Sequence, residues 1–309
     1  MAINKKGMVF TLVAIALVSL FSISYSVYSF VNDRSSVDSR IETMNRYIFS
    51  MQEDFSRKLY ITSFRIIFVY EKRIAERGVY IDDVASTFEE AFFYGTIEGT
   101  ADSSEQTLFE GVLFDDILES LNSDAIRLNL LINFTNPSVA ISQTDPWNVL
   151  VNLTGELNIT DIGGLASWNK TTSIYTYIPI SYFEDPLYVV NTNGLVPRKF
   201  NKTIYFFDDT SVLNLTNHLE GKYYSSSVLA PSFLNRLEGN LTANQNGIES
   251  LVYLPDLAAQ GISLSDKSIV DYIYFSSENP SKNQISGMPS WVKIDSAHQG
   301  FYNVSGMII

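Results

Sequence analysis

The chain has 309 residues, of which 46% are hydrophobic and 18% are charged, and its formal net charge at pH 7 is −13. This composition is typical of a folded protein with one large domain or two smaller ones. The acidic charge argues against nucleic acid as a partner, because phosphate binding needs clustered lysine and arginine. The absence of cysteine excludes disulfides, thiolate catalysis and cysteine-based metal sites.

The first 31 residues carry only two charges, Lys5 and Lys6, so the rest of the chain has a net charge of −15. An apolar segment over residues 8–30 contains no charge at all. As a helix it would be about 34 Å long, enough to cross the roughly 30 Å hydrocarbon core of a bilayer. The preceding lysines predict a cytoplasmic N-terminus. We therefore expect a transmembrane helix over residues 8–31, the lipid bilayer as a partner, and a single-pass cell-membrane protein with an extracellular C-terminal body.

Three interpretations of this segment remain open. Small residues at Ser22, Ser24 and Ser26 fit a cleaved secretory signal, although bulky tyrosines lie between and after them. A plain signal anchor is the second interpretation. The third depends on Lys5, Lys6 and Gly7, which stand directly before the apolar segment.

This N-terminus resembles that of archaeal proteins with a class III, type IV pilin-like leader. In that family a peptidase cuts after a Lys-Gly or similar pair and leaves the apolar helix on the mature protein. The resemblance implies a leader over residues 1–7, processing at Lys5, Lys6, Gly7 and Met8 with the cut between Gly7 and Met8, and a prepilin-type peptidase and pilin-like subunits as partners. The chain departs from the pattern at Met8, where glutamine is frequent, and at Leu12, where bacterial pilins have glutamate.

Helical patterns continue after the apolar segment. A helix that ends near Gly78 is expected to carry one apolar stripe, which packs either on the chain's own body or between subunits. The stripe comprises Val37, Ile41, Met44, Ile48, Met51, Phe55 and Leu59. A second helix is expected from Asp82 to Gly95, and a third after Thr107, whose spacing from Glu110 fits a capping box. Residues 32–125 are thus expected to form a helical stalk and a helical subdomain.

The charges of this helical region are separated along the chain. Residues 33–77 contain nine bases and seven acids, whereas residues 78–126 contain twelve acids and no base. We expect the two segments to pair within the chain. The alternative is an acidic face that binds divalent cations or a basic partner, but no spaced ligand motif supports it.

After Arg127 the apolar period becomes alternating, as in residues 148–157 and 173–180. Asn193-Gly194 predicts a type I′ hairpin turn between two strands. We expect residues 126–309 to form a β-rich, sandwich-like extracellular domain with short helices near residues 231–238 and 248–257, so that the whole chain is of the α+β class.

Eight sequons for N-glycosylation lie in this second half, and seven of them use threonine although serine is the commoner residue. Most have an apolar middle residue, which on a strand would put asparagine and threonine on one face. Such a pattern also arises on β-rich surfaces without glycans, but the predicted topology favours glycosylation. The acceptors are Asn133, Asn152, Asn158, Asn169, Asn201, Asn214, Asn240 and Asn303.

The chain lacks a recognisable catalytic signature. His218 and His298 are the only histidines, Ser226 and Ser232 have no evident base, and no phosphate loop or nucleophile elbow occurs. The paired acids at 82–83, 115–116, 184–185 and 208–209 are typical of caps and turns. Segments 185–194 and 230–240 resemble motifs, but they match no domain that we recognise. We therefore expect neither an enzyme nor a cofactor or metal site.

Residues 174–207 are rich in aromatic side chains. We expect most of them to fill a core, although exposed rings could stack on sugars. The sequence thus favours a pilin-like, membrane-anchored surface glycoprotein with a role in assembly or attachment. An anchored adhesin that binds a surface glycan is the alternative, and an extracellular hydrolase is the least favoured function.

Overall fold

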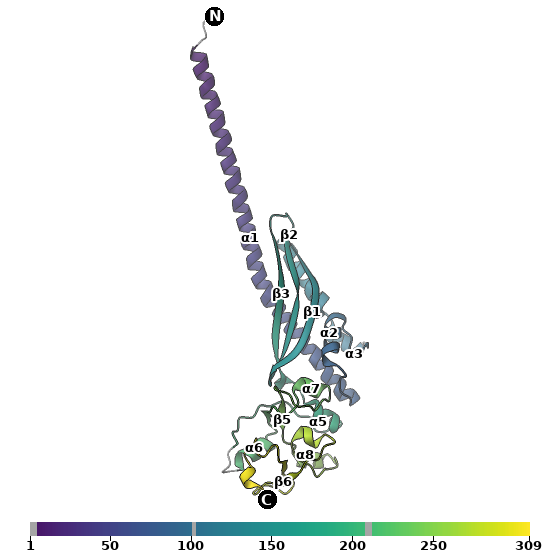
Figure 1. The fold of residues 1–309 in the computed structure, drawn as a ribbon. Helices are drawn as coiled ribbons and strands as arrows, with labels where there is room; N and C mark the ends of the chain where they lie inside the picture. The colour runs from purple at the N-terminus through teal and green to yellow at the C-terminus, as the bar shows by residue number, and fades with distance from the viewer. Residues whose placement is uncertain (1–4, 101–102, 208–211) are drawn as a thin grey trace. The chain divides into compact units, whose positions relative to one another are not determined.

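The computed structural model describes residues 5–100, 103–207 and 212–309, which form a mixture of helices and sheets (Figure 1). The chain divides into two compact units. Unit 1 comprises Met1–Asp54, Leu118–Asn136 and Gly155–Thr172, and unit 2 comprises Phe55–Ile117, Pro137–Thr154 and Ser173–Ile309. Both units contain helical and strand residues.

Helix α1 (Lys5–Arg77) contains 73 residues and ends where Gly78 adopts a φ of 67°, a left-handed conformation that glycine takes without strain. The apolar stripe is buried from Met44 to Leu59, whereas Ile41 is 44% exposed. In unit 1, the hydroxyl of Tyr47 donates a hydrogen bond to the carbonyl oxygen of Leu121, at 2.9 Å. The stripe therefore packs largely within the chain itself.

Helix α2 (Val84–Tyr94) is confirmed with both of its expected ends. The side chain of Asp83 accepts a hydrogen bond from the amide of Ser86, and Gly95 ends the helix with a φ of 66°. The expected capping box is wrong, because Thr107 lies inside α3 (Ser103–Phe109). Helix α4 (Phe114–Arg127) follows, and the Asp116 carboxylate accepts the amide of Leu113 at 3.0 Å in its first turn.

Arg73 joins the basic and acidic segments inside unit 2. Its side chain is buried, and it donates two hydrogen bonds to the carboxylate of Glu105, at 2.7 and 2.6 Å. Two further bonds reach the carbonyl oxygen of Ile97 and the hydroxyl of Thr100. The expected pairing of the two segments is therefore present at this arginine.

Three long strands form a sheet with the order β1-β2-β3: β1 (Leu130–Asp145), β2 (Asn148–Asp161) and β3 (Ser167–Pro179). Their connections are short, so neighbouring strands are antiparallel. Buried and more exposed side chains alternate along each strand, most regularly in β2. The alternating pattern predicted from the sequence is confirmed in this part of the chain.

Beyond Pro179 the prediction of a β-rich, sandwich-like domain has to be corrected. The described residues there form short helices, two 3-10 turns (Ile180–Tyr182 and Ser305–Met307) and strands of three residues, and they contain no long strand. The helices are α5 (Pro186–Asn191), α6 (Leu213–Glu220), α7 (Phe233–Leu237), α8 (Leu254–Ala259) and α9 (Asp271–Tyr274). The strands are β4 (Tyr224–Ser226) paired with β5 (Ile248–Ser250), and β6 (Lys282–Gln284) paired with β7 (Lys293–Asp295), both pairs antiparallel.

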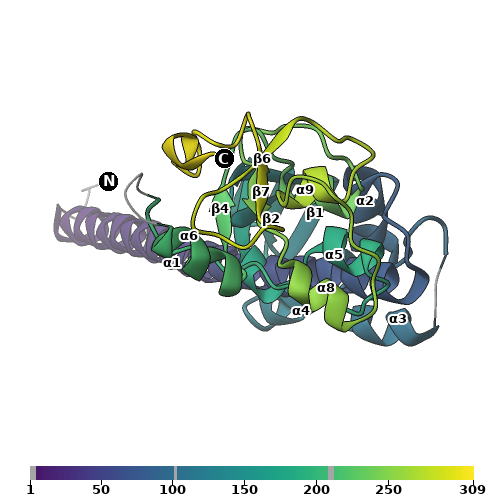
Figure 2. The same cartoon turned by 90° about the horizontal axis from the view of Figure 1, so that it is seen from below.

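Helices α5, α6, α8 and α9 and strand β7 contribute to one core, and the short elements of unit 2 lie close together in both views (Figure 2). Tyr188, Leu219, Val252, Ile273 and Ile294 are among its buried residues. The side chains come from helices, strands and loops alike. Tyr188 of this core also belongs to the polar cluster described below.

The predicted hairpin at Asn193-Gly194 is also wrong, although its turn geometry is right. Asn193 and Gly194 have φ values of 51° and 73°, as a type I′ turn requires. The segment before them is helix α5 and not a strand. Asp185 accepts the amide of Leu187 and Pro186 occupies the first turn, which are signals for the start of a helix.

Candidate functional site

The membrane segment predicted from the sequence lies within α1. Among the described residues, Val9–Val31 is the one helical segment long and apolar enough to cross a bilayer, with a mean hydropathy of 2.1 and no part of it buried. The predicted processing residues Lys5, Lys6, Gly7 and Met8 lie in the first turns of the same helix. The rest of the predicted leader, residues 1–4, is outside the described residues.

The eight sequons differ in accessibility. Five acceptors are exposed, namely Asn133, Asn169, Asn201, Asn240 and Asn303, and three are half-buried, namely Asn152, Asn158 and Asn214. Among the half-buried residues, Asn214 donates a hydrogen bond to the carbonyl oxygen of Phe206, and Asn152 accepts one from Ser173. On β1 and β2 the apolar middle residues are buried opposite the asparagine and threonine, as expected.

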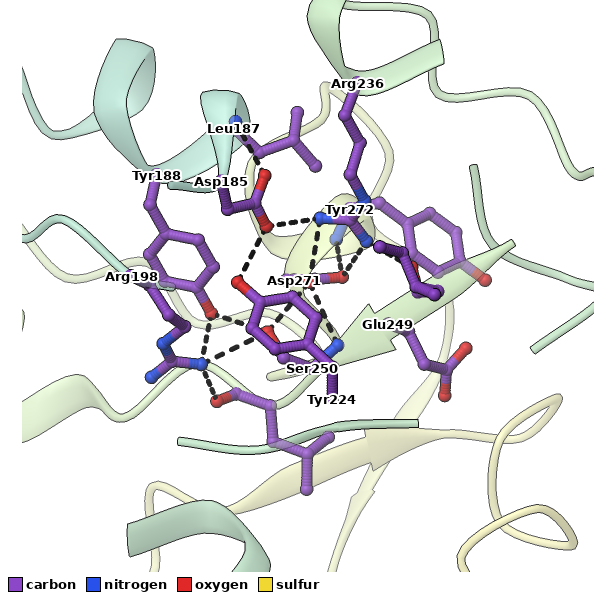
Figure 3. A network of polar contacts seen from close by, with 12 residues as sticks. Asp185, Leu187, Tyr188, Arg198, Tyr224, Arg236, Glu249, Ser250, Asp271 and Tyr272 are labelled. Carbon is purple, nitrogen blue, oxygen red and sulfur yellow. Dashed lines mark hydrogen bonds and ion pairs between the residues drawn. The ribbon is translucent and has the colours of Figure 1, made fainter. Parts of the chain in front are cut away.

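The most strongly charged buried cluster lies in unit 2 and is centred on Arg236 of α7 (Figure 3). Its guanidinium donates hydrogen bonds to Asp185 at 2.6 Å and to both carboxylate oxygens of Asp271, at 3.1 and 3.2 Å. A further bond reaches the carbonyl oxygen of Ile248. Asp185 also accepts the hydroxyl of Tyr224, at 2.8 Å. All three charged side chains are fully buried.

A second arginine extends the cluster on the other side of Ser250. The Arg198 guanidinium donates to the hydroxyls of Tyr188 and Ser250, at 2.6 and 3.1 Å, and to the carbonyl oxygen of Leu251. The amide and hydroxyl of Ser250 donate to Asp271. The cluster thus pairs two cations with two acids, and it joins α5, α7, α9, β4 and β5 (Figure 3).

Burial raises the pKa of Asp185, and Arg236 counteracts this shift. Burial also opposes the charged form of Arg236, but the two neighbouring carboxylates raise its pKa overall. The guanidinium therefore stays protonated and holds the carboxylates in the interior. Because the members are enclosed and mutually hydrogen-bonded, the geometry fits a structural cluster that fixes the fold and presents no exposed acid or base to a substrate.

The second buried cluster surrounds His298. Its Nδ1 lies 2.8 and 2.9 Å from the two carboxylate oxygens of Asp295, and its Nε2 lies 2.9 Å from the hydroxyl of Tyr272 and 3.4 Å from Glu249. Burial favours the neutral ring, but the bonds to Asp295 and Glu249 raise the pKa of His298 to about 10. Burial raises the pKa of Asp295, but the hydrogen bond with His298 and the charge of His298 lower this pKa overall. His298 is therefore a buried cation.

The free energy of unfolding is expected to fall between pH 6.5 and 10 because of His298. Its folded-state pKa lies above the unfolded value of about 6.5, so its contribution is complete below that pH and is lost as the pH rises towards 10. One such proton gives a slope of at most about 1.4 kcal/mol per pH unit. Chemical unfolding of the full-length protein in detergent, measured across this range, should show this slope, and the His298→Gln variant should lose it.

His218→Gln is the matched control, because His218 is also fully buried but neutral. Burial lowers the pKa of His218 to about 3, so its ring does not titrate between pH 6.5 and 10. Its substitution should leave the slope unchanged. An equal slope in the wild type and the His298→Gln variant would show that His298 is not the titrating group.

No group of three or more potential metal ligands exists among the described residues. The hydroxyl of Ser232 accepts the amide of Asn235 as the cap of α7, and Ser226 is exposed. Asp208 and Asp209 are outside the described residues.

Segments 185–194 and 230–240, which match no recognised domain, supply Asp185, Tyr188 and Arg236 to the first cluster. Sequence analysis missed this cluster because its members are far apart in the chain. The one available signal was the motif-like character of the two segments.

The chain matches no family model, no curated protein and no solved structure.

Proposed function

We propose that the chain is a pilin-like, single-span surface protein with an N-glycosylated external domain and a role in assembly or attachment. The observation that carries the proposal is helix α1, in which the exposed apolar segment Val9–Val31 continues into a part whose stripe is buried from Met44 onward. Pilin-like proteins extend their membrane helix in this manner. The first part of the helix suits lipid or the core of a filament, and the second part belongs to the folded body.

The charges support an orientation with the body outside. Lys5 and Lys6 precede the apolar segment, and the residues after it have a net charge of −15. Positive residues remain preferentially on the cytoplasmic side of a membrane helix. The resemblance to class III leaders adds cleavage between Gly7 and Met8 by a prepilin-type peptidase, which would leave α1 on the mature protein.

Glycan occupancy is expected to follow the exposure of the acceptor asparagines. In protein purified from its native membrane, we expect glycans mainly on the five acceptors that are exposed, Asn133, Asn169, Asn201, Asn240 and Asn303. The half-buried Asn152, Asn158 and Asn214 should be modified less or not at all. Intact-mass and glycopeptide analysis measures this distribution, and unmodified asparagine at all eight sites would contradict glycosylation.

Orientation is tested separately with a single cysteine, which is possible because the chain contains none. Ser181 is exposed in unit 2, so a Ser181→Cys variant should react with a membrane-impermeant maleimide on intact cells. Labelling only after lysis would place this domain in the cytoplasm. If no glycan is found, this labelling experiment therefore distinguishes a cytoplasmic domain from an external domain that is not glycosylated.

The alternative function, an adhesin, is favoured by one specific observation. Four rings of the aromatic-rich region are exposed, against the expectation that most would be buried: Tyr175, Tyr177, Tyr182 and Phe206. Phe183, Tyr188 and Phe200 from the same region are buried. Exposed rings are suited to stacking on a ligand.

A further inference from the structure

A cavity in unit 2 is lined mainly by aromatic rings. Its volume is about 320 Å³, and the rings are those of Trp147, Tyr205, Phe206, Phe207 and Phe301. This volume is at the lower end of the range for small-molecule sites. Phe206 is 87% exposed, so a large apolar ring faces solvent at the cavity. A ligand that covers such a ring removes apolar surface from water, which lowers the free energy of the complex.

The remaining lining residues are polar. Thr203, Ser225 and Ser226 are hydroxyl residues, and Lys202 is the one charged side chain among the described lining residues. Its ammonium lies 5.4 Å from the centre of the Trp147 ring, and it forms no ion pair with the described residues. The hydroxyl of Ser225 is buried and has no hydrogen-bond partner among them. The cavity therefore combines flat apolar walls with polar groups and one cation.

Several contacts hold these walls in place without a ligand. The amide of Trp147 donates to Asp145 at 2.8 Å, and its carbonyl oxygen accepts the amide of Ile180 at 3.0 Å. The Phe207 ring meets the buried ring of His218 edge to face, with centroids 5.1 Å apart. His218 in turn bonds the hydroxyl of Thr203, at 3.0 Å. Ordered walls of this kind lower the entropic cost of binding.

We propose that this cavity, hereafter the aromatic pocket, binds an acidic sugar unit of an oligosaccharide. The apolar face of a sugar ring stacks on aromatic side chains, and its hydroxyls bond to threonine and serine. The ammonium of Lys202 can form an ion pair with a carboxylate on the sugar. Because the chain has a net charge of −13, binding of an anion requires such a local cation. A peptide would find only one charged side chain among the described lining residues, whereas a sugar uses both the aromatic rings and the hydroxyl groups.

The test uses the full-length protein in lipid nanodiscs, produced in a host without N-glycosylation so that Asn201, next to Lys202, is bare. The probes are uronate tetramers based on glucose, mannose and galactose, each paired with its neutral counterpart. Calorimetry and saturation-transfer NMR should show saturable binding of at least one uronate and weaker binding of its neutral counterpart. Phe206→Ala should weaken uronate binding about three- to tenfold, because stacking on one ring is lost. Lys202→Gln should weaken it by about threefold or more and leave neutral sugars unaffected.

Tyr94→Ala is the matched control, because Tyr94 is an exposed ring at the end of α2 that belongs to the same unit and does not line the pocket. It should bind like the wild type, and unchanged near-ultraviolet circular dichroism should show that all three variants are folded. The proposal is overturned if no uronate binds, if neutral sugars bind equally well, or if Phe206→Ala binds normally. Binding of an aromatic peptide in place of every sugar would also overturn it. None of these results bears on leader cleavage or orientation, so the proposed function is tested independently.

Discussion

Replacement of Arg236 by methionine is expected to destabilise unit 2 by about 3–5 kcal/mol, because it leaves two buried carboxylates without their cation. Asp185 and Asp271 are fully buried, and Arg236 bonds both of them. The loss is a large part of the roughly 5–15 kcal/mol by which proteins are stable. Chemical unfolding of the full-length protein in detergent, followed by near-ultraviolet circular dichroism, measures it.

A pH series shows whether the unpaired carboxylates cause this loss. Burial already raises the pKa of Asp185, and removal of Arg236 should raise it further, so the carboxyl becomes neutral at a higher pH. The difference in unfolding free energy between the wild type and the variant should therefore become smaller as the pH falls from 7 to 5. Arg127→Met is the control, because the Arg127 side chain is 78% exposed in its ion pair with Asp124. A loss of unfolding free energy equal to that of the Arg127→Met control would contradict a structural role for the cluster. A loss that does not change with pH would also contradict it.

Substitution of Gly7 by leucine is expected to block leader cleavage completely. The resemblance to pilin-like leaders implies that the peptidase cuts after a Lys-Gly or similar pair, so a branched side chain in place of Gly7 should prevent the cut. The membrane form of the variant should then retain residues 1–7, and its intact mass should exceed that of the wild type by the mass of this leader. Asn4→Gln changes the leader away from the cut and should be processed normally. Equal masses for the Gly7→Leu variant and the wild type would contradict the predicted site.

The elements that could be predicted from the sequence are those specified by neighbouring residues. The end of α1 at Gly78 and both ends of α2, at Asp83 and Gly95, follow from capping residues. The three long strands follow from alternating apolar residues. Each of these signals acts over a few residues and needs no information about the rest of the chain.

Competing local signals explain the incorrect elements. Thr107 and Glu110 have the spacing of a capping box, but α3 extends over Thr107 and Asp116 binds the amide of Leu113 at the start of α4. The apolar segment after Pro186 has the composition of a strand, yet Asp185 and Pro186 together start a helix. In both cases an aspartate that accepts a backbone amide, Asp116 in α4 and Asp185 at α5, sets where the helix begins.

The buried cluster and the aromatic pocket could not be predicted because their residues are distant in the sequence. Arg236 is 51 residues from Asp185 and 35 from Asp271. Trp147, Phe206 and Phe301 reach one cavity from three separate loops or turns. Periodicity and spacing carry no information about such contacts. They arise from the way the short elements of unit 2 pack.

The N-terminal residue of the protein in its native membrane tests the proposed function most directly. The protein should be extracted from the membrane fraction with detergent and sequenced from its N-terminus without proteolysis. A start at Met8 is predicted, with α1 retained on the mature chain. A start at Met1 or Ala2 would indicate an uncleaved anchor, and a start near Val27 would indicate a cleaved secretory signal; either result would contradict a pilin-like protein.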